Sequence, residues 1–445
     1  MFTAALCGVA VWGASVSAAE TPYRFNDPAG VTWYELSTPL MAGNRPPDLN
    51  GNVGTGLVYQ GRQEGGQFGG AGGNYYNRAS NTLTISLSGL GVYRTPDAGS
   101  SWVELNRIFT GREESEYVFS ADPSNENRMI AFCIYGRSTI TIDGTTWKNT
   151  DPTKGFDFGS VDWTDPQAKV MIAMTHTDPP PGEIYMSTNG GASWTLKGKW
   201  CHNSVGTDDN KDNGKTMLHV VNATTFLISN VDGIYRSTNS GGSWTKMHNA
   251  VSGINKTLKK IGTKLYAGYE NGVLVCDADG TNWRSFCGAP SGGIIHGPMF
   301  GADETSMLAP NYNGLYKTTN SGASWTAVTP FSYPPKGTYL NSSPDRPYYA
   351  GENSDYKYGS NAWAWDYRRN IVYVGHMGGP MLKLQLPGIG SGVNPATAKA
   401  LHGVLGRQAG VERFDMRGRR ITPGTTAQIM VDMAGRVHLA KSLVR

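Results

Sequence analysis

Carboxylates in loops next to short β-rich runs are the first residues of this sequence that could do chemistry. Asp157, Glu270 and Glu116 each stand at such a position, far apart along the chain. Glycoside hydrolysis needs two carboxyl groups about 5 to 9.5 Å apart, one protonated and one charged, on either side of the scissile bond. If the fold brings two of these three side chains together, they supply that pair.

A second set of side chains suits a different reaction. A polysaccharide lyase needs an arginine or histidine that neutralises a uronate and a histidine or tyrosine that abstracts the α-proton. Residues of these types in the same kind of loop are His176, Arg137, His296, Tyr312 and His376. Hydrolysis and elimination both remain open on this evidence.

Further side chains could bind a sugar without transferring protons. Arg112 and Arg137 could hold polar or anionic groups, and aromatic rings could stack on sugar rings. The aromatic candidates are Tyr75, Tyr76, Trp163, Tyr312, Trp363 and Trp365. A lone loop carboxylate is usually only solvated, and a lone histidine or aromatic is more often a packed structural residue. The candidates form a site only if the fold makes them converge.

The elements that would position these residues come from an internal repeat. The same unit occurs six times, and its final tryptophans stand 39 to 50 residues apart. The units are Thr95-Pro-Asp-Ala-Gly-Ser-Ser-Trp102, Asp143-Gly-Thr-Thr-Trp147, Ser187-Thr-Asn-Gly-Gly-Ala-Ser-Trp194, Ser237-Thr-Asn-Ser-Gly-Gly-Ser-Trp244, Asp279-Gly-Thr-Asn-Trp283 and Thr318-Thr-Asn-Ser-Gly-Ala-Ser-Trp325. Such repetition predicts one repeat architecture rather than the two or three domains that length alone suggests.

Each unit has the composition of a tight turn after a β-rich run. Ser, Thr, Asp and Asn bond their own backbone, Gly accepts a positive φ, and Trp packs against the preceding strand. The unit resembles the Asp-box, or BNR repeat, of sialidases, of tandem-propeller xyloglucanases and of sortilin-type domains. Three copies carry Asn where Asp is usual, and two are shorter by a residue.

That resemblance implies an all-β fold: a seven-bladed β-propeller with Asp-box turns, plus a short C-terminal tail. In the family the Asp-box joins the third and fourth strands of a blade, opposite the ligand. Residues in second-to-third loops, which here include His176, Glu270, Tyr312 and His376, would then converge over the central channel.

Ring closure follows from a blade that lacks one strand. A seventh blade reads from Ala362 to Leu386 without the repeated turn, and the segment Val31 to Ser37, with Trp33, is predicted to complete it. Such a closure hides two sheet edges. The Gly-rich segment Gly51 to Asn77, which contains Tyr75, is predicted to lie over the channel mouth.

The resemblance departs from the family in two places. Sialidases bind the substrate carboxylate with three arginines, and here only Tyr23-Arg-Phe-Asn26 is similar to the motif that carries one of them. Xyloglucanases use two facing propellers, so their catalytic aspartates are not transferred to this chain. No Walker loop, dinucleotide fingerprint, Ser/His/Asp elbow or zinc spacing occurs. We therefore expect no cofactor and no metal.

The two ends of the sequence predict export. Residues 1–19 have the apolar run and small-residue exit of a signal peptide, 20–388 form the propeller, and 389–400 read as a linker. Residues 401–445 resemble the sorting tail of proteins exported by the type IX secretion system, although a basic disordered tail is the alternative. The expected location is the medium or surface of a Gram-negative bacterium, with the export machinery as a partner through the tail.

Charge and cysteines limit the remaining possibilities. The net charge is +4, but nine basic and three acidic residues follow Leu386, so the predicted propeller is slightly acidic and nucleic acid is not an expected partner. A monomer is expected. Cys276 and Cys287 are close enough in sequence to bridge neighbouring strands.

These features lead to a carbohydrate-active propeller that acts on a cell-wall polysaccharide or oligosaccharide, as a glycoside hydrolase or, second, as a polysaccharide lyase. The catalytic candidates are Asp157, His176, Glu270 and His376, and the binding candidates are Arg112, Arg137, His296, Tyr312, Tyr75 and Trp363. One alternative is a non-catalytic carbohydrate- or protein-binding module, and another is an assembly factor for a membrane complex, which the sorting tail disfavours.

Overall fold

The computed structural model describes residues 21–22, 31–36, 73–87, 91–106, 119–132, 138–150, 155–175, 182–200, 217–230, 233–250, 258–269, 271–294, 296–311, 313–333, 362–375, 382–387, 413–414, 420–421, 429–431 and 437–439. The chain divides into two units, 1–388 and 389–445. Within the described residues every regular element is a β-strand. No helix in these ranges has the length and apolarity to cross a membrane.

Six four-stranded antiparallel sheets follow one another along the first unit, and each is one blade. Blades 1 to 3 are β3 (Gly73–Asn77), β4 (Thr82–Leu87), β5 (Gly91–Thr95), β6 (Val103–Asn106); β7 (Phe119–Ala121), β8 (Met129–Ala131), β9 (Thr139–Thr141), β10 (Trp147–Asn149); and β11 (Phe156–Val161), β12 (Met171–Thr175), β13 (Gly182–Ser187), β14 (Thr195–Trp200). Blades 4 to 6 are β15 (Met217–Asn222), β16 (Thr225–Asn230), β17 (Gly233–Ser237), β18 (Thr245–His248); β19 (Lys259–Ile261), β20 (Lys264–Tyr269), β21 (Gly272–Asp277), β22 (Arg284–Gly288); and β23 (Met299–Phe300), β24 (Met307–Asn311), β25 (Gly314–Thr318), β26 (Thr326–Ala327).

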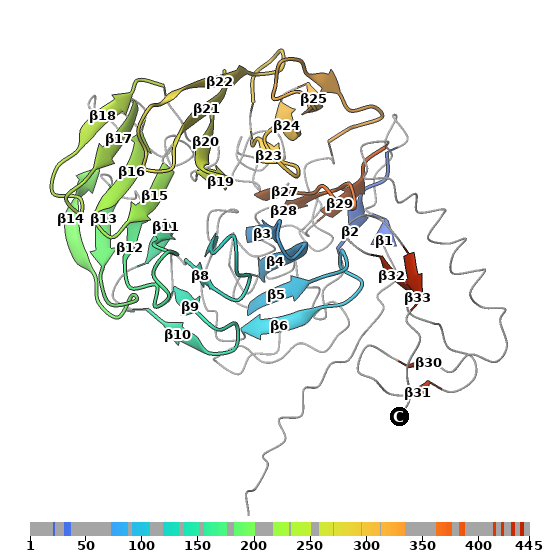
Figure 1. Cartoon of the computed structure of the whole chain (residues 1–445), viewed down its shortest axis with the longest axis horizontal. Coiled ribbons are helices and arrows are strands. Elements are labelled where there is room, and N and C mark those ends of the chain that lie inside the picture. The colour runs from blue at the N-terminus through green and yellow to red at the C-terminus, as the bar shows by residue number, and fades with distance from the viewer. Residues whose placement is uncertain are drawn as a thin grey trace, which may run out of the picture. The chain divides into compact units, whose positions relative to one another are not determined.

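The seventh blade joins both ends of the first unit. Its strands β27 (Ala362–Asp366), β28 (Ile371–Gly375) and β29 (Leu382–Gln385) continue through β2 (Tyr34–Glu35) to β1 (Thr21–Pro22). The first strands of neighbouring blades lie side by side, as β27 does with β23 and β3, so they are innermost and surround one axis (Figure 1). The predicted all-β fold, a seven-bladed β-propeller, is confirmed.

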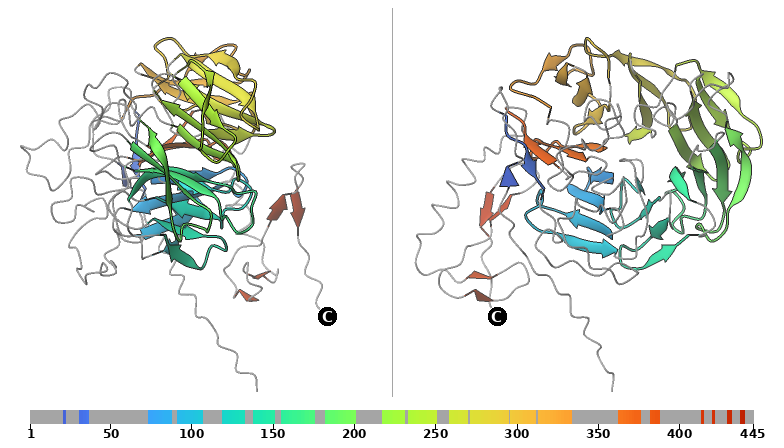
Figure 2. Two further views of the ribbon diagram at one scale, coloured as in Figure 1. Left: turned by 90° about the vertical axis from the view of Figure 1, so that its left-hand side faces the viewer. Right: turned by 180° about the vertical axis from the view of Figure 1, so that it is seen from behind.

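The closing strand is shorter than the predicted segment Val31 to Ser37, because only Tyr34 and Glu35 pair with β29. Trp33 lies directly before β2 and is fully buried, and its Nε1 donates a hydrogen bond to the carbonyl of Ser332 (3.0 Å). In Figures 1 and 2 the blue β2 lies beside β29 at the end of the chain's path around the ring. The sequence did not predict β1, which gives this blade a fifth strand.

The repeated units form the turns between third and fourth strands. In the β17–β18 turn the Ser237 Oγ accepts a hydrogen bond from the Gly241 amide (2.9 Å), and the Asn239 Oδ1 accepts one from the Ser243 amide (2.8 Å). Gly241 has φ 81°, which a residue with a side chain rarely adopts. Asn in place of Asp keeps the same hydrogen bond of the turn with the donor reversed. The Asn239 Nδ2 donates to the Ser243 Oγ (2.9 Å), whereas in the β5–β6 turn the Asp97 carboxylate accepts from the Ser101 Oγ.

The two cysteines that could bridge neighbouring strands are not bridged. Cys276 and Cys287 are both free and buried. Cys276 packs with Leu227 and Leu265, whereas Cys287 packs with Phe300 and belongs to a different cluster. Burial raises the pKa of both thiols, to about 12 for Cys276 and about 11 for Cys287, so they stay protonated at neutral pH.

The second unit contains two short hairpins among its described residues. β30 (Arg413–Phe414) pairs with β31 (Arg420–Ile421), and β32 (Ile429–Val431) pairs with β33 (Val437–Leu439). The predicted linker, the sorting role of this tail and the signal peptide remain predictions.

Candidate functional site

The strand order gives the propeller two chemically different faces. Neighbouring strands of each blade are antiparallel, so first-to-second and third-to-fourth turns share one face, which we call the turn face. Second-to-third and fourth-to-first connections share the opposite face, which we call the connection face. The repeated turns therefore belong to the turn face.

Six predicted site residues lie outside the described residues, but the strands that flank them are described. His176 falls between β12 and β13, Glu270 between β20 and β21, Tyr312 between β24 and β25, and His376 between β28 and β29. Arg137 falls between β8 and β9, and Arg112 between β6 and β7. The strands that flank these six positions end at the connection face, and the location of the six residues themselves stays a prediction.

Asp157 lies within a strand, not in a loop as the sequence predicted. It belongs to β11, where Phe156 pairs with Thr175 and Phe158 with Met174, so Asp157 is the extra residue of a β-bulge. A bulge bends a strand and turns a side chain away from regular alternation, and bulges are frequent beside active sites. β11 is an innermost strand, and this bulge is at its end on the connection face.

Blades 5 and 6 approach each other closely at the connection face. A Cβ on Gly268, in the second strand of blade 5, would stand 1.9 Å from the carbonyl oxygen of Gly297. Gly297 belongs to the connection that enters blade 6 and directly follows His296, while Gly268 precedes the predicted Glu270 by two positions. Only a glycine at 268 allows this approach, which brings the His296 connection to the strand that leads to Glu270.

Replacing Gly268 by alanine should displace that connection. We expect a destabilisation of about 1 to 3 kcal/mol, because the backbone of Gly297 must move to admit a methyl group. The control is Gly288→Ala in the same blade, where a Cβ meets nothing within 4 Å. Chemical denaturation of both variants measures the difference, and equal unfolding free energies would show that the approach is not tight.

Two predicted binding residues meet where blades 6 and 7 adjoin. The rings of His296 and Trp363 have centroids 6.3 Å apart, and Trp363 is 6.0 Å from Tyr333 in an edge-to-face contact. Trp363 is only 2% exposed and His296 only 4%. A sugar stacks on an accessible ring face, so their burial fits packing beneath the connection face better than stacking on a ligand.

Tyr333 is a member of this cluster that the sequence reasoning missed. Its hydroxyl bonds to the carbonyls of Asn311 (2.5 Å) and Gly314 (3.0 Å), the two ends of the turn that contains Tyr312. Phe331 stands edge-to-face between Tyr333 and Trp33, with centroids 5.0 and 6.3 Å away. A row of aromatic rings thus connects the closing segment to the Tyr312 turn. No local sequence pattern marks Tyr333.

Tyr75 and the other described aromatic candidates, Tyr76, Trp163 and Trp365, make packing contacts. Tyr75 and Tyr76 lie in β3 rather than in a loop over the channel mouth, and Tyr75 packs against a core that includes Val92 and Phe119. Burial is the main cause that raises the pKa of the Tyr75 phenol, so it stays protonated. Trp365 is buried, and Trp163 packs over the Arg128 guanidinium (5.3 Å) and donates to the Ser120 Oγ (3.1 Å).

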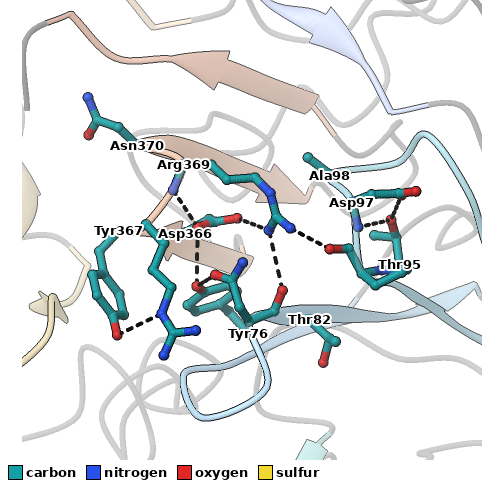
Figure 3. Close-up of polar contacts among 12 residues, drawn as sticks. Tyr76, Thr82, Thr95, Asp97, Ala98, Asp366, Tyr367, Arg369 and Asn370 are labelled. Atoms are coloured by element: carbon teal, nitrogen blue, oxygen red, sulfur yellow. Dashed lines mark hydrogen bonds and ion pairs between the residues drawn. The ribbon is translucent and has the colours of Figure 1, made fainter. Parts of the chain in front are cut away.

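Polar groups on the turn face bond mainly to one another. Where blades 7 and 1 adjoin, the buried Asp366 carboxylate accepts hydrogen bonds from the Arg369 Nη1 (2.7 Å), the Arg369 amide (2.8 Å) and the Tyr76 hydroxyl (3.2 Å) (Figure 3). The Arg369 guanidinium also donates to the carbonyls of Asn81 (3.3 Å) and Pro96 (2.5 Å) in blade 1. These groups therefore hold blades 7 and 1 together. Within the described residues no His, Cys, Asp or Glu cluster could hold a metal ion.

The similarities to known proteins concern solved structures. No protein family and no curated protein matches this chain. It is similar to a GH74 enzyme from Niastella koreensis (16% identity, TM-score 0.46, covering 73% of this chain and 53% of that one) and to the GH74 xyloglucanase from Xanthomonas campestris (14%, 0.43, 74% and 53%). It is also similar to YCF48 from Cyanidioschyzon merolae, with 12% identity and a TM-score of 0.40; the match covers 73% of this chain and 97% of that one. The chain spans about half the length of the two GH74 enzymes, and at these identities the likeness concerns the fold alone.

Proposed function

We propose that this protein is an exported, carbohydrate-active β-propeller that cleaves a cell-wall polysaccharide on its connection face. One observation carries the proposal: the strands that precede and follow His176, Glu270, Tyr312 and His376 in the sequence are the second and third strands of four blades that surround one axis. Convergence of polar groups from several elements on one mouth is what a sugar site requires. The repeated turns, which we interpret as Asp-boxes, serve structure on the opposite face.

Glycoside hydrolysis is the first choice of reaction. Asp157 and Glu270 would form the carboxyl pair, one as general acid and the other as base or nucleophile. The bulge at Asp157 supports this assignment, because it interrupts the regular register of β11 between Phe156 and Phe158, and bulges are frequent beside active sites. In the lyase alternative His176 or His376 takes the α-proton, while Arg112 and Arg137 neutralise the uronate.

A non-catalytic binding module is the second function. The burial of His296, Trp363 and Trp365 favours it, since these residues then serve the scaffold and leave fewer groups for a catalytic cleft. The remaining parts of the proposal rest on sequence: a signal peptide over 1–19, a type IX sorting tail over 401–445, a location at the surface of a Gram-negative bacterium and a monomeric state.

A polysaccharide panel tests the reaction. We expect new reducing ends with one acidic or neutral cell-wall glycan, without the ultraviolet absorbance of unsaturated uronates. New reducing ends together with that absorbance indicate the lyase. Retention of a glycan on affinity gels without cleavage indicates the binding module, and no binding or cleavage across the panel contradicts a carbohydrate role.

Site variants test the residues. Glu270→Gln, and separately the double variant of His176 and His376 to Ala, should lower turnover or affinity at least tenfold, which is about 1.4 kcal/mol, with thermal stability nearly unchanged. The control is Glu304→Gln, since this carboxylate lies in the β23–β24 turn of the opposite face. Full activity of both site variants would show that the connection-face assignment is wrong.

A further inference from the structure

An unassigned histidine lies in an innermost strand, between blades 4 and 5. In β15 the side chains of Leu218 and Val220 pack with Phe158 and Ile172 of blade 3. Successive side chains of a strand alternate between faces. His219 therefore lies on the other face of β15, toward blade 5, where Val221 packs on the core shared by blades 4 and 5.

Lys260 lies opposite, in the innermost strand of blade 5. Leu258 packs with Leu227 and Ile234 of blade 4, so Lys260, two positions later, is on the same face of β19 and also turns toward blade 4. Ile261 packs instead with Phe300 of blade 6, which shows that the alternation holds. Lys260 is exposed, whereas His219 is half-buried.

The pair lies close to the connection face and to the axis. Lys260 is the second residue of β19 and His219 the third of β15, and both strands begin at fourth-to-first connections. Among the described residues no carboxylate pairs with Lys260, and no hydrogen bond joins the His219 imidazole to another side chain. The residue paired with His219 on β16, Leu227, is apolar, as is Val221. An ammonium group and an imidazole thus face the same junction between blades 4 and 5, with no described counter-charge beside them.

Burial, and secondly the positive charge of Lys260, lower the pKa of the His219 imidazole to about 4. At neutral pH the imidazole is therefore uncharged and offers one N–H donor and one acceptor nitrogen. An anion placed beside both groups would cancel the effect of Lys260 and favour the protonated imidazole, since an opposite charge within a few ångströms stabilises the charged form.

We propose that His219 and Lys260 form a binding site for a carboxylate group, such as that of a uronic acid residue in an acidic polysaccharide. Lys260 supplies the charge and His219 a directional N–H donor, and the carboxylate oxygens accept from both. This inference rests on the proposed function and narrows its substrate class to uronate-containing glycans that reach the axis from the connection face.

The test follows the protonation of His219 by NMR in the whole protein, with the resonance assigned by its loss in His219→Gln. Free protein should show a pKa of about 4, and saturating D-glucuronate should raise it to about 5 or above, which by linkage means at least tenfold tighter binding to the protonated form. Methyl glucoside, which is neutral, should leave the pKa unchanged. An unchanged pKa in glucuronate, or an equal rise in inorganic phosphate, would overturn the assignment to carboxylates.

Two lysine variants separate the site from a general charge effect. Lys260→Gln should raise the pKa of His219 in the free protein and abolish the response to glucuronate, because it removes the positive neighbour. Lys259→Gln should behave as the wild type, since Lys259 lies on the opposite face of β19. If Lys260→Gln keeps the wild-type response, Lys260 is not part of the site.

The outcome is distinguishable from failure of the proposed function. A glucuronate response in a protein that neither binds nor cleaves any polysaccharide keeps the carboxylate site and removes the proposed function. Cleavage of a neutral glycan with no glucuronate response does the reverse, because the site at His219 and Lys260 then takes no part.

Discussion

Replacing Arg369 by alanine should lower the free energy of unfolding by about 3 kcal/mol, which is the lower end of the range for breaking a buried ion pair. The Arg369 side chain pairs with the Asp366 carboxylate at 2.7 Å, and the exposed fractions of the two side chains are 34% and 1%. The variant leaves the Asp366 charge buried beside the Arg369 amide and the Tyr76 hydroxyl, without its ion-pair partner.

The position of this pair is the reason for the large expected loss of stability. Asp366 is the last residue of β27 in blade 7, and Arg369 lies in the turn that follows. The Arg369 guanidinium donates to the carbonyls of Asn81 and Pro96 in blade 1. Lys383 makes a parallel contact from β29, because its Nζ donates to the Ala98 carbonyl (2.9 Å). These bonds join the C-terminal strands of blade 7 to blade 1, and Figure 3 shows the contacts of Arg369.

The neighbouring arginine provides a matched control. Arg368 is exposed on the same turn and donates to the Tyr367 hydroxyl (3.2 Å) and the Arg78 carbonyl (3.3 Å). Its replacement by alanine should cost less than about 1 kcal/mol, as exposed polar contacts do. Urea unfolding measures the free energy of unfolding of both variants. Equal losses of this free energy would show that the ion pair with Asp366 does not stabilise the ring more than an exposed contact does.

The fold was predictable because its signal repeats. Each turn carries a local requirement, such as the positive φ of Gly241 and the amide partners of Asn239, and the same requirement recurs at a near-constant interval. Trp33 could be assigned to the seventh blade for a related reason, since that blade lacked one strand. β1 was not predicted, because it is only two residues long and includes Pro22, and such a segment has no periodicity to detect.

The site was predictable only as a face. Topology assigns connections to one side of the ring, but whether an aromatic ring is open or packed depends on contacts between blades that no local pattern encodes. Trp363 illustrates this, because it packs against His296 from another blade and is buried. His219 was not predicted as a site residue, because between Leu218 and Val220 it has the pattern of an ordinary strand position. Only the fold shows that Lys260 of the next blade faces it.

Replacing Trp33 by alanine should be the most damaging single change in the closing segment. The side chain is fully buried, contacts Phe331 edge-to-face (6.3 Å) and donates to the Ser332 carbonyl. Loss of a buried tryptophan costs about 3 to 5 kcal/mol, and we expect the free energy of unfolding to fall by that amount. The control is Thr32→Ala on the same segment, where the side chain is exposed and should cost little.

Loss of Trp33 should also open the ring, which loss of an ordinary core residue would not do. β2 pairs with β29 through two residue pairs only, Tyr34 with Lys383 and Glu35 with Leu382, so the strand depends on its flanking anchors, Trp33 and Leu36. When Trp33 is lost, β2 should detach and leave β29 as an unpaired edge, which favours association between molecules. We therefore expect Trp33→Ala to aggregate in proportion to its concentration below its melting temperature, and Trp33→Phe, which keeps part of the buried ring, to be intermediate in stability and to stay monomeric. Light scattering at several concentrations measures this, and a Trp33→Ala variant that melts cooperatively as a monomer at the wild-type temperature would show that the N-terminal strand does not hold the ring closed.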